Sequence, residues 1–151
     1  EVIEDIVDCG RLAPSAKNMQ QLHFVVVDDK EKLQKMAESR EMGSQFLGGA
    51  PLAVLVLAEE KKSNVWVEDC SIAALLIQLA AHDLGLGSCW VQVRNRIKEE
   101  GVSTENFLKE VFEVPDGMKM ECVIGIGYKD EEKRPVDEAK LLMDRVHRNK
   151  F

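Results

Sequence analysis

The sequence lacks the patterns that identify several large classes of protein. No apolar run approaches the ~20 residues that a bilayer-spanning helix needs, and no signal-peptide pattern opens the chain. Positive charge is not in excess: the formal net charge is -7, which argues against a nucleic acid as the main partner. Basic residues gather near the C-terminus, but acidic residues are interspersed among them, as on a solvated surface. We therefore expect neither a membrane nor a nucleic acid as a partner.

Metal-binding and disulfide patterns are also missing. The four cysteines form no C-x-x-C pair, and each lies in an apolar helix or strand pattern; they are Cys9, Cys70, Cys89 and Cys122. This spacing, in a chain with only three histidines, argues against a zinc site. Cysteines in such patterns behave as small buried apolar residues in a reducing compartment. We expect buried thiols, no metal and a cytoplasmic location.

The glycine-rich stretches do not fit a nucleotide-binding motif. Residues 85–90 (GLGSCW) lack the third glycine and lie between a helix pattern and a strand pattern, the reverse of a Rossmann turn. No Walker-type G-K-[ST] and no G-x-S-x-G elbow occurs. His82 lies on the polar stripe of an apolar helix pattern and is expected to be a hydrogen-bonded structural residue. We assign no catalytic side chain, which favours a cofactor that carries its own chemistry.

The chain has 151 residues, of which 45% are hydrophobic, and this is enough for a single domain over 1–151 with a substantial core. Hydrophobic periodicity predicts helices over 2–12, 30–37, 68–84 and 102–112, and strands over 24–27, 51–58, 88–93 and 120–128. Their alternation predicts an α+β or α/β fold in three layers. The run over 51–58 is apolar throughout, as in a central strand buried on both faces.

The helix predicted over 68–84 is apolar on nearly every side. Its polar residues Ser71, Gln78 and His82 fall on one narrow stripe, and the other residues between Cys70 and Ala81 are apolar. A helix of this kind must be buried on several sides. In a small domain, that favours packing against a second subunit as well as against the chain's own sheet.

The most informative segment is the turn between the first helix and the first strand, which reads RLAPSAKNMQ over residues 11–20. Its small residues let the backbone come close to a flat ligand, and the amides of Asn18 and Gln20 offer both donors and acceptors. Such a loop suits reading the edge of a heterocycle, although a Pro-Ser-Ala turn is most often only a turn.

Four segments together resemble the FMN-dependent nitroreductase family, in the right order over essentially the whole chain. The loop over 11–20 is similar to the family's first flavin loop. The stretch 80–90 (AAHDLGLGSCW) resembles its central dimer helix and the strand that follows. Residues 123–128 (VIGIGY) resemble its last core strand, and residues 146–151 (VHRNKF) resemble the tail of small members.

The resemblance implies a mixed sheet of four to five strands flanked by helices, in an obligate homodimer with two FMN molecules at the subunit interface. It implies an oxidoreductase in which NAD(P)H reduces FMN, leaves, and is replaced by a small electron-poor acceptor such as a nitroaromatic or a quinone. The chemistry would reside in the flavin, with no indispensable acid or base from the protein.

The resemblance also assigns cofactor-binding residues to three places. In the loop, Pro14, Ser15 and Ala16 would line the flavin or ribityl chain, and Asn18 and Gln20 would hydrogen-bond their oxygens. Backbone N–H groups of the strand after the long helix would approach flavin N5 and O4, where a donor stabilises the reduced anion without titrating. The tail would contact the phosphate, which arginine grips bidentately. The strand residues are Trp90, Val91, Gln92 and Val93, and the tail candidates are Lys133 and Arg134.

Two departures from the family pattern matter. Members usually open with an Arg-Arg-Ser-x-Arg segment that supplies most of the phosphate grip, and this sequence starts after that point. Either the segment was removed or the protein lacks it and binds FMN weakly. Members also often carry Gln-Pro-Trp where this chain has Gln20-Gln21-Leu22, so a different pocket shape is expected there. A non-redox flavin-binding or partner-binding dimer that kept the fold is therefore the alternative function. A dehalogenase or flavin-fragmenting relative is disfavoured, because those tend to add a lid.

Overall fold

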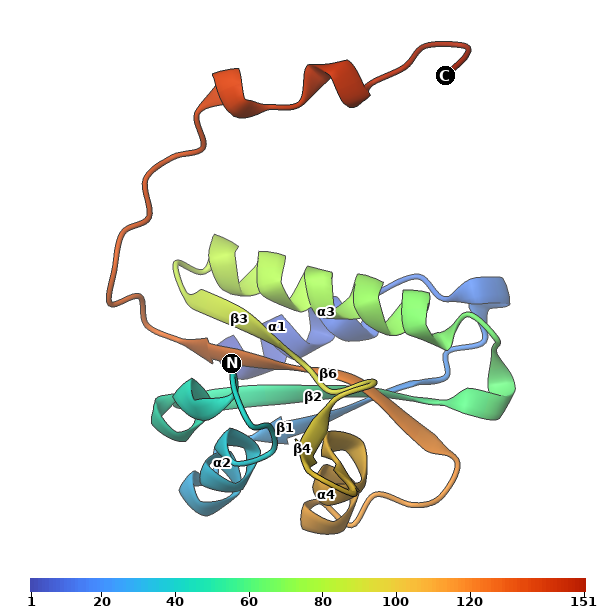
Figure 1. The fold of residues 1–151 in the computed structure, drawn as a ribbon, viewed down its shortest axis with the longest axis vertical. Helices are drawn as coiled ribbons and strands as arrows, with labels where there is room; N and C mark the ends of the chain where they lie inside the picture. The colour runs from blue at the N-terminus through green and yellow to red at the C-terminus, as the bar shows by residue number, and fades with distance from the viewer.

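A four-stranded sheet with the order β1-β2-β6-β3 lies at the centre of the molecule (Figure 1). The computed structural model describes residues 1–151, apart from the side chain of Met143. The strands of the sheet are β1 (Leu22–Val27), β2 (Leu52–Glu59), β3 (Gly87–Gln92) and β6 (Met118–Gly127). Each of the strands predicted from the sequence corresponds to one of these, with bounds that differ by at most two residues.

The α+β class is confirmed, but the sheet formed by these strands is not mixed. All three pairings among them are antiparallel. The connection between β1 and β2 explains why these two strands run in opposite directions. Helix α2 (Lys30–Ala37) and the 3-10 turn η2 (Gln45–Gly49) pack against each other, so the chain leaves the sheet and re-enters it at the same end, which makes the two strands antiparallel.

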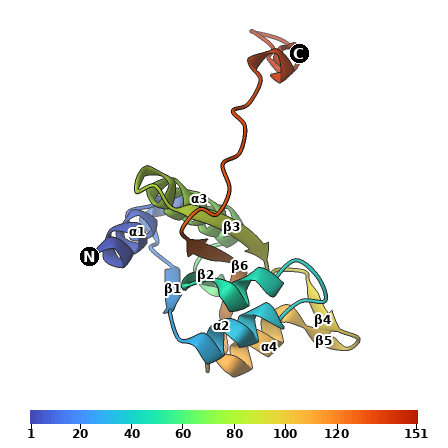
Figure 2. The same cartoon turned by 90° about the vertical axis from the view of Figure 1, so that its left-hand side faces the viewer.

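Helices cover both faces of the sheet and give the three layers that the alternation predicted (Figure 2). Helices α1 (Val2–Arg11) and α3 (Trp66–Asp83) lie on one face, and α2 and α4 (Thr104–Val111) lie on the other. Each face has its own cluster of buried apolar side chains. Strand β2 contributes to both clusters, because its residues from Leu52 to Ala58 are all buried. The prediction of a central strand buried on both faces is confirmed.

The hydrophobic pattern of the sequence did not predict a short hairpin that precedes α4. Strands β4 (Ile97–Glu99) and β5 (Val102–Ser103) pair antiparallel, and they are too short to show an alternating pattern. Ser103 then caps α4: its Oγ accepts a hydrogen bond from the backbone N–H of Asn106 at 3.0 Å.

The last segment, residues 128–151, leaves the sheet after β6 and extends away from the body of the molecule (Figures 1 and 2). It contains two 3-10 turns, η4 (Glu138–Lys140) and η5 (Met143–Arg145). Exposed apolar side chains recur along it, those of Tyr128, Val136, Leu141, Leu142, Val146 and Phe151. Within the part of the chain that the structure describes, no helix is long and apolar enough to cross a membrane.

Candidate functional site

The structure places the loop before β1 and the last residues of β3 at the same end of the sheet. The three antiparallel pairings make β1 run opposite to β3, so the start of the first lies level with the end of the second. The strand register shows the same alignment. At this end of the sheet Leu22 of β1 pairs with Ala58 of β2, Leu57 of β2 pairs with Met120 of β6, and Cys122 of β6 pairs with Gln92 of β3. Three interstrand spacings of ~4.8 Å separate the two edges by ~14 Å. The two predicted flavin segments therefore lie at one end but on opposite edges.

The first segment, here called the amide loop (residues 14–21), has an unusual backbone. Lys17, Asn18 and Gln20 all have positive φ angles, of 52°, 54° and 49°. Left-handed backbone costs most L-residues about 1–2 kcal/mol each, so the loop needs contacts that hold it. One is local: Ser15 Oγ accepts a hydrogen bond from the backbone N–H of Gln20 at 3.0 Å. Pro14, Asn18 and Gln20 are exposed, and Ala16 is half-buried.

The buried carboxylate of Asp69, on α3, forms hydrogen bonds with the amide loop. Both oxygens of Asp69 accept from the backbone N–H of Ala16, at 3.2 and 3.1 Å. Its Oδ2 also accepts from Nε2 of Gln21 at 2.5 Å. Gln21 is fully buried, and its Oε1 has no partner among the described residues. Sequence reasoning missed both residues. The one signal was the departure from the family pattern at Gln21.

A cleft of about 610 Å³ opens beside the amide loop. It is formed by α1, the loop and β1, so it lies on the β1 side of the sheet. Ser15 and Gln20 line it together with Arg11, His23 and Phe24. His23 is half-exposed, and its Nε2 lies 3.0 Å from Oε1 of Glu59. Among the predicted residues, Ser15 and Gln20 are thus brought together at a hollow of the size that binding sites for small ligands have.

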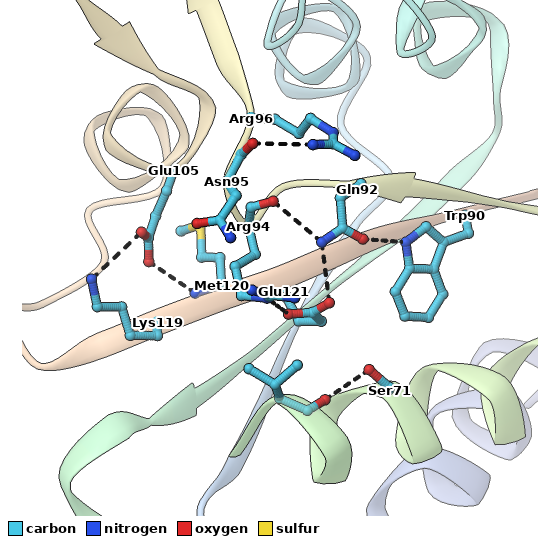
Figure 3. A network of polar contacts seen from close by, with 11 residues as sticks. Ser71, Trp90, Gln92, Arg94, Asn95, Arg96, Glu105, Lys119, Met120 and Glu121 are labelled. Atoms are coloured by element: carbon cyan, nitrogen blue, oxygen red, sulfur yellow. Dashed lines mark hydrogen bonds and ion pairs between the residues drawn. The ribbon is translucent and has the colours of Figure 1, made fainter. Parts of the chain in front are cut away.

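The second segment, at the end of β3, is fixed by a chain of polar contacts (Figure 3). Trp90 Nε1 donates to Oε1 of Gln92 at 2.9 Å. Gln92 Nε2 donates to Oε1 of Glu121 at 3.1 Å and to the carbonyl of Arg94 at 3.3 Å. Arg94 Nε donates to Oε2 of Glu121 at 2.8 Å. The predicted residues Trp90 and Gln92 are therefore in direct contact, and Gln92 links Trp90 to the buried carboxylate of Glu121.

Glu121 occupies this position because β6 bulges there. Val56 of β2 pairs with Cys122 and Leu57 pairs with Met120, so Glu121 is the extra residue between them. The backbone N–H of Met120, at the same irregularity, donates to Oε1 of Glu105 from α4 at 3.0 Å. A bulge re-aims a side chain, and here it directs a buried carboxylate toward Arg94 and Gln92 (Figure 3). Nothing in the sequence pattern of β6 marked this residue.

The backbone at Val93 does not have the free donor that the resemblance implied. Its N–H donates to the carbonyl of Glu121 at 3.0 Å, and that of Arg94 donates to the same oxygen at 3.1 Å. The side chains of Val91 and Val93 are buried in the cluster on the α2 and α4 face. For Val91, only the backbone can therefore face a ligand, while for Val93 even the N–H is already occupied.

The two buried cysteines, Cys70 and Cys122, give no reactive thiolate. Burial and, to a smaller extent, the nearby carboxylates of Glu121 and Asp69 raise the pKa of the Cys70 thiol to about 12. Burial likewise raises the pKa of Cys122 well above its usual range, with smaller contributions from Glu121 and Cys70. Both stay protonated at neutral pH. The prediction that all four thiols are buried is wrong for Cys89, which is exposed on edge strand β3, and Cys9 is half-buried.

The structure does not place the tail candidates Lys133 and Arg134 beside the amide loop or the end of β3. Lys133 lies 3.6 Å from Glu131, with both side chains exposed, and Arg134 is exposed next to it. Both belong to the segment that extends away from the body (Figure 1). His82 is exposed on α3, which does not support the expected structural role. Among the residues that the structure describes, no group of three histidine, cysteine or acidic side chains is placed to hold a metal ion.

Comparisons with known proteins agree on one family. A sequence model described as "Nitroreductase family" matches residues 1–43 and 33–128. A protein from Archaeoglobus fulgidus named "Putative NADH dehydrogenase/NAD(P)H nitroreductase" is 40% identical over 156 residues, covering 100% of this chain and 86% of that protein. A protein of the same name from Methanothermobacter thermautotrophicus is 35% identical and covers 100% and 76%. The solved structure of an FMN-dependent nitroreductase from Clostridium difficile is 45% identical, with a TM-score of 0.97 over 99% of this chain and 87% of that one.

Proposed function

The chain belongs to the nitroreductase family, and from this we propose that it is an FMN-dependent oxidoreductase. It takes hydride from NAD(P)H and delivers it to a small electron-poor acceptor such as a nitroaromatic or a quinone. The observation that carries the proposal is the amide loop, whose left-handed backbone is held by Asp69 and exposes two amides beside a cleft. The named likeness to an FMN-dependent enzyme supports it.

The residues at this end of the sheet fit FMN. The cleft beside Ser15 and Gln20 measures about 610 Å³, within the range of small-molecule sites. The exposed amides of Asn18 and Gln20 carry donors and acceptors in one group, which suits the alternating polar edge of a flavin. Gln21 Oε1 adds a buried acceptor that no described residue satisfies, and the ribityl hydroxyls are donors. Bound FMN would supply the two-electron chemistry.

The protein's own part is binding and orientation. Pro14, Ser15, Ala16, Asn18 and Gln20 would hold the cofactor on the β1 side of the site. Trp90, Val91 and Gln92 would face it from β3, and the Glu121 network keeps the side chains of Trp90 and Gln92 in place. Lys133 or Arg134 would supply the phosphate contact from the tail. We assign no acid or base, in line with chemistry that the cofactor carries itself.

We further propose that the active form is a homodimer, with a second copy on the exposed face of α3. Ile72, Leu75 and Leu79 lie at spacings of three and four residues, so they share one face of the helix, and their exposed fractions are 41%, 54% and 54%. The opposite face of α3 packs on the sheet through Cys70, Ala74 and Ile77, among others. A self-complementary face of this kind fits a two-fold dimer. A cytoplasmic location is part of the same proposal, supported by four free cysteines.

An absorbance spectrum of the purified full chain, loaded with FMN and treated anaerobically with NADPH and then NADH, tests the proposal. A flavin band at ~450 nm that bleaches with either nucleotide is the expected result. A bound flavin that neither nucleotide bleaches would instead favour the non-redox flavin-binding dimer. A protein that takes up no FMN would overturn the assignment of the amide loop.

The two exposed amides give a second test. Asn18→Gly and Gln20→Gly remove the amide but accept the left-handed backbone, unlike alanine. Each is expected to raise the Kd for FMN by about 2- to 10-fold, since a hydrogen bond contributes roughly 0.5–1.5 kcal/mol. The measurement is a fluorescence titration of FMN into the cofactor-free protein.

Glu113→Gly is the matched control for these variants. Glu113 is exposed at the end of α4 and has the same kind of backbone, with φ 52°, so it reports the effect of a new glycine alone. Unchanged FMN affinity in both loop variants, or an equal loss in the control, would count against the loop as the cofactor site.

A further inference from the structure

We propose that Asp69 is the positioning residue that holds the amide loop in the shape that receives the cofactor. The inference rests on the proposed function for the identity of that cofactor, but the contact itself is a property of the chain. Asp69 touches neither the cleft-lining side chains nor the exposed amides directly. It acts on them through the two residues that bracket the left-handed stretch, Ala16 and Gln21.

The contacts of Asp69 differ from those of an ordinary acidic residue in a first helical turn. Such a residue normally interacts with the start of its own helix, yet α3 has no side-chain cap at Val65. Both oxygens of Asp69 are instead used on the loop, 53 and 48 residues earlier in the chain. The side chain is only 5% exposed, so these bonds form away from water and replace its solvation.

The two contact points of Asp69 span the strained part of the loop. Ala16 precedes Lys17 and Asn18, and Gln21 follows Gln20, so every left-handed residue of the loop lies between them. Gln21 is also fixed at the other end, because its carbonyl accepts from the backbone N–H of Glu59 in β2 at 3.0 Å. The loop is thereby tied to α3 and to the sheet, and only its short outer turn is free to present side chains.

This arrangement has a consequence for binding. A loop that already has its bound conformation loses less conformational freedom when a ligand arrives, and so binds it more tightly. Without the carboxylate, Ala16 N–H and Gln21 Nε2 lose their acceptor, and the left-handed residues can relax. The amides of Asn18 and Gln20 would then need to be ordered by the cofactor itself. Asp69 therefore affects affinity without touching the ligand.

The test compares Asp69→Ala, Asp69→Asn and Gln21→Leu with Thr104→Val as the control. Thr104 is buried, and its Oγ1 donates to the carbonyl of Ser39 at 2.8 Å on the far side of the sheet, so its loss lowers stability without reaching the loop. Two quantities are measured: amide hydrogen exchange of residues 16–21 in the cofactor-free protein, and the Kd for FMN. Hydrogen exchange detects local opening independently of any ligand.

Asp69→Ala is expected to speed exchange in residues 16–21 and to raise the Kd for FMN by about 10- to 100-fold, the loss of hydrogen bonds to a charged acceptor. Asp69→Asn should lie between it and the native protein, since its carbonyl can still accept from Ala16. Gln21→Leu removes one contact and should also be intermediate. Thr104→Val should lower the melting temperature but change neither loop exchange nor the Kd.

Loop exchange that stays unchanged in Asp69→Ala would overturn the inference. So would a loss of FMN affinity no larger than that of Thr104→Val at equal stability. If Asp69→Ala does not fold, Asp69→Asn and Gln21→Leu decide by the same two criteria. If the native protein binds no FMN, the proposed function fails, while the exchange data still decide whether Asp69 holds the loop.

Discussion

Replacing Leu75 and Leu79 together by glutamate is expected to give a folded monomer that retains no FMN. Both side chains are exposed on the single chain, so their replacement should change the folding of one subunit by no more than about 0.5 kcal/mol each. In the proposed dimer they are buried, and a buried leucine contributes about 1.5–3 kcal/mol. Two-fold symmetry doubles the loss, because each subunit carries both changes.

The dimer dissociation constant should therefore rise by at least about 1,000-fold, since each 1.4 kcal/mol is a factor of ten. Sedimentation velocity at micromolar concentration measures the association, and absorbance at ~450 nm measures the retained flavin. Met42→Glu serves as the control, because Met42 is also an exposed apolar residue and lies away from α3, in the loop after α2. A native protein that sediments as a monomer, or a double variant that stays dimeric, would contradict the assignment of α3 as the interface.

This prediction connects the two halves of the candidate site. The amide loop and the end of β3 lie on opposite edges of one sheet, and the tail candidates Lys133 and Arg134 belong to the segment that extends away from the body. A single chain thus does not enclose a ligand with all the predicted residues. A second copy against α3, whose first turn carries Asp69, would bring further surface to the same end of the sheet. Loss of the dimer and loss of FMN should therefore occur together.

Local patterns predicted the elements well because local chemistry determines them. Helix α2 has the predicted bounds because Asp29 caps it, accepting from Lys32 N–H at 2.9 Å, and because Leu33, Met36 and Ala37 give its buried side. The continuous apolar run of β2 predicted its burial on both faces for the same reason. The apolar character of α3 predicted that the sheet alone could not cover it, and Leu75 and Leu79 are indeed left exposed.

Features that depend on distant pairing were not predictable in this way. The antiparallel order of the sheet follows from how the connections return, which no single segment encodes. Glu121 read as one more strand residue, because a bulge is visible only against the partner strand. Asp69 read as an ordinary acid in a first helical turn, since the bond to Ala16 joins residues 53 positions apart. The loop was recognised from its composition, but not the carboxylate that holds it.

Alkaline pH is expected to destabilise the protein steeply, through its two buried thiols. Burial, together with the nearby carboxylates of Glu121 and Asp69, raises the pKa of Cys70 from its ordinary value of about 9 to about 12, and burial raises that of Cys122 as well. A pKa that is higher in the folded state means that the folded protein keeps a proton that the unfolded chain releases. The stability that each thiol contributes is therefore complete below pH 9 and is lost as the pH rises toward the folded value. Above pH 9 each thiol should lower the free energy of unfolding by about 1.4 kcal/mol per pH unit.

Urea unfolding at pH 8, 9, 10 and 11 under reducing conditions measures this slope. The two thiols together should contribute about 2.7 kcal/mol per pH unit, and each of Cys70→Ala and Cys122→Ala should remove half of that while lowering the stability at pH 8. The difference between native and variant slopes cancels the contributions of lysine and tyrosine, which are common to both.

Cys89→Ala, which removes an exposed thiol, should leave the slope unchanged. A double variant Cys70→Ala with Cys122→Ala that is as steep as the native protein would show that the buried thiols do not cause the loss. Because Asp69 and Glu121 add to the burial effect at Cys70, Asp69→Asn should lower the pH at which the Cys70 component is fully lost, while its onset near pH 9 stays in place because the unfolded chain sets it.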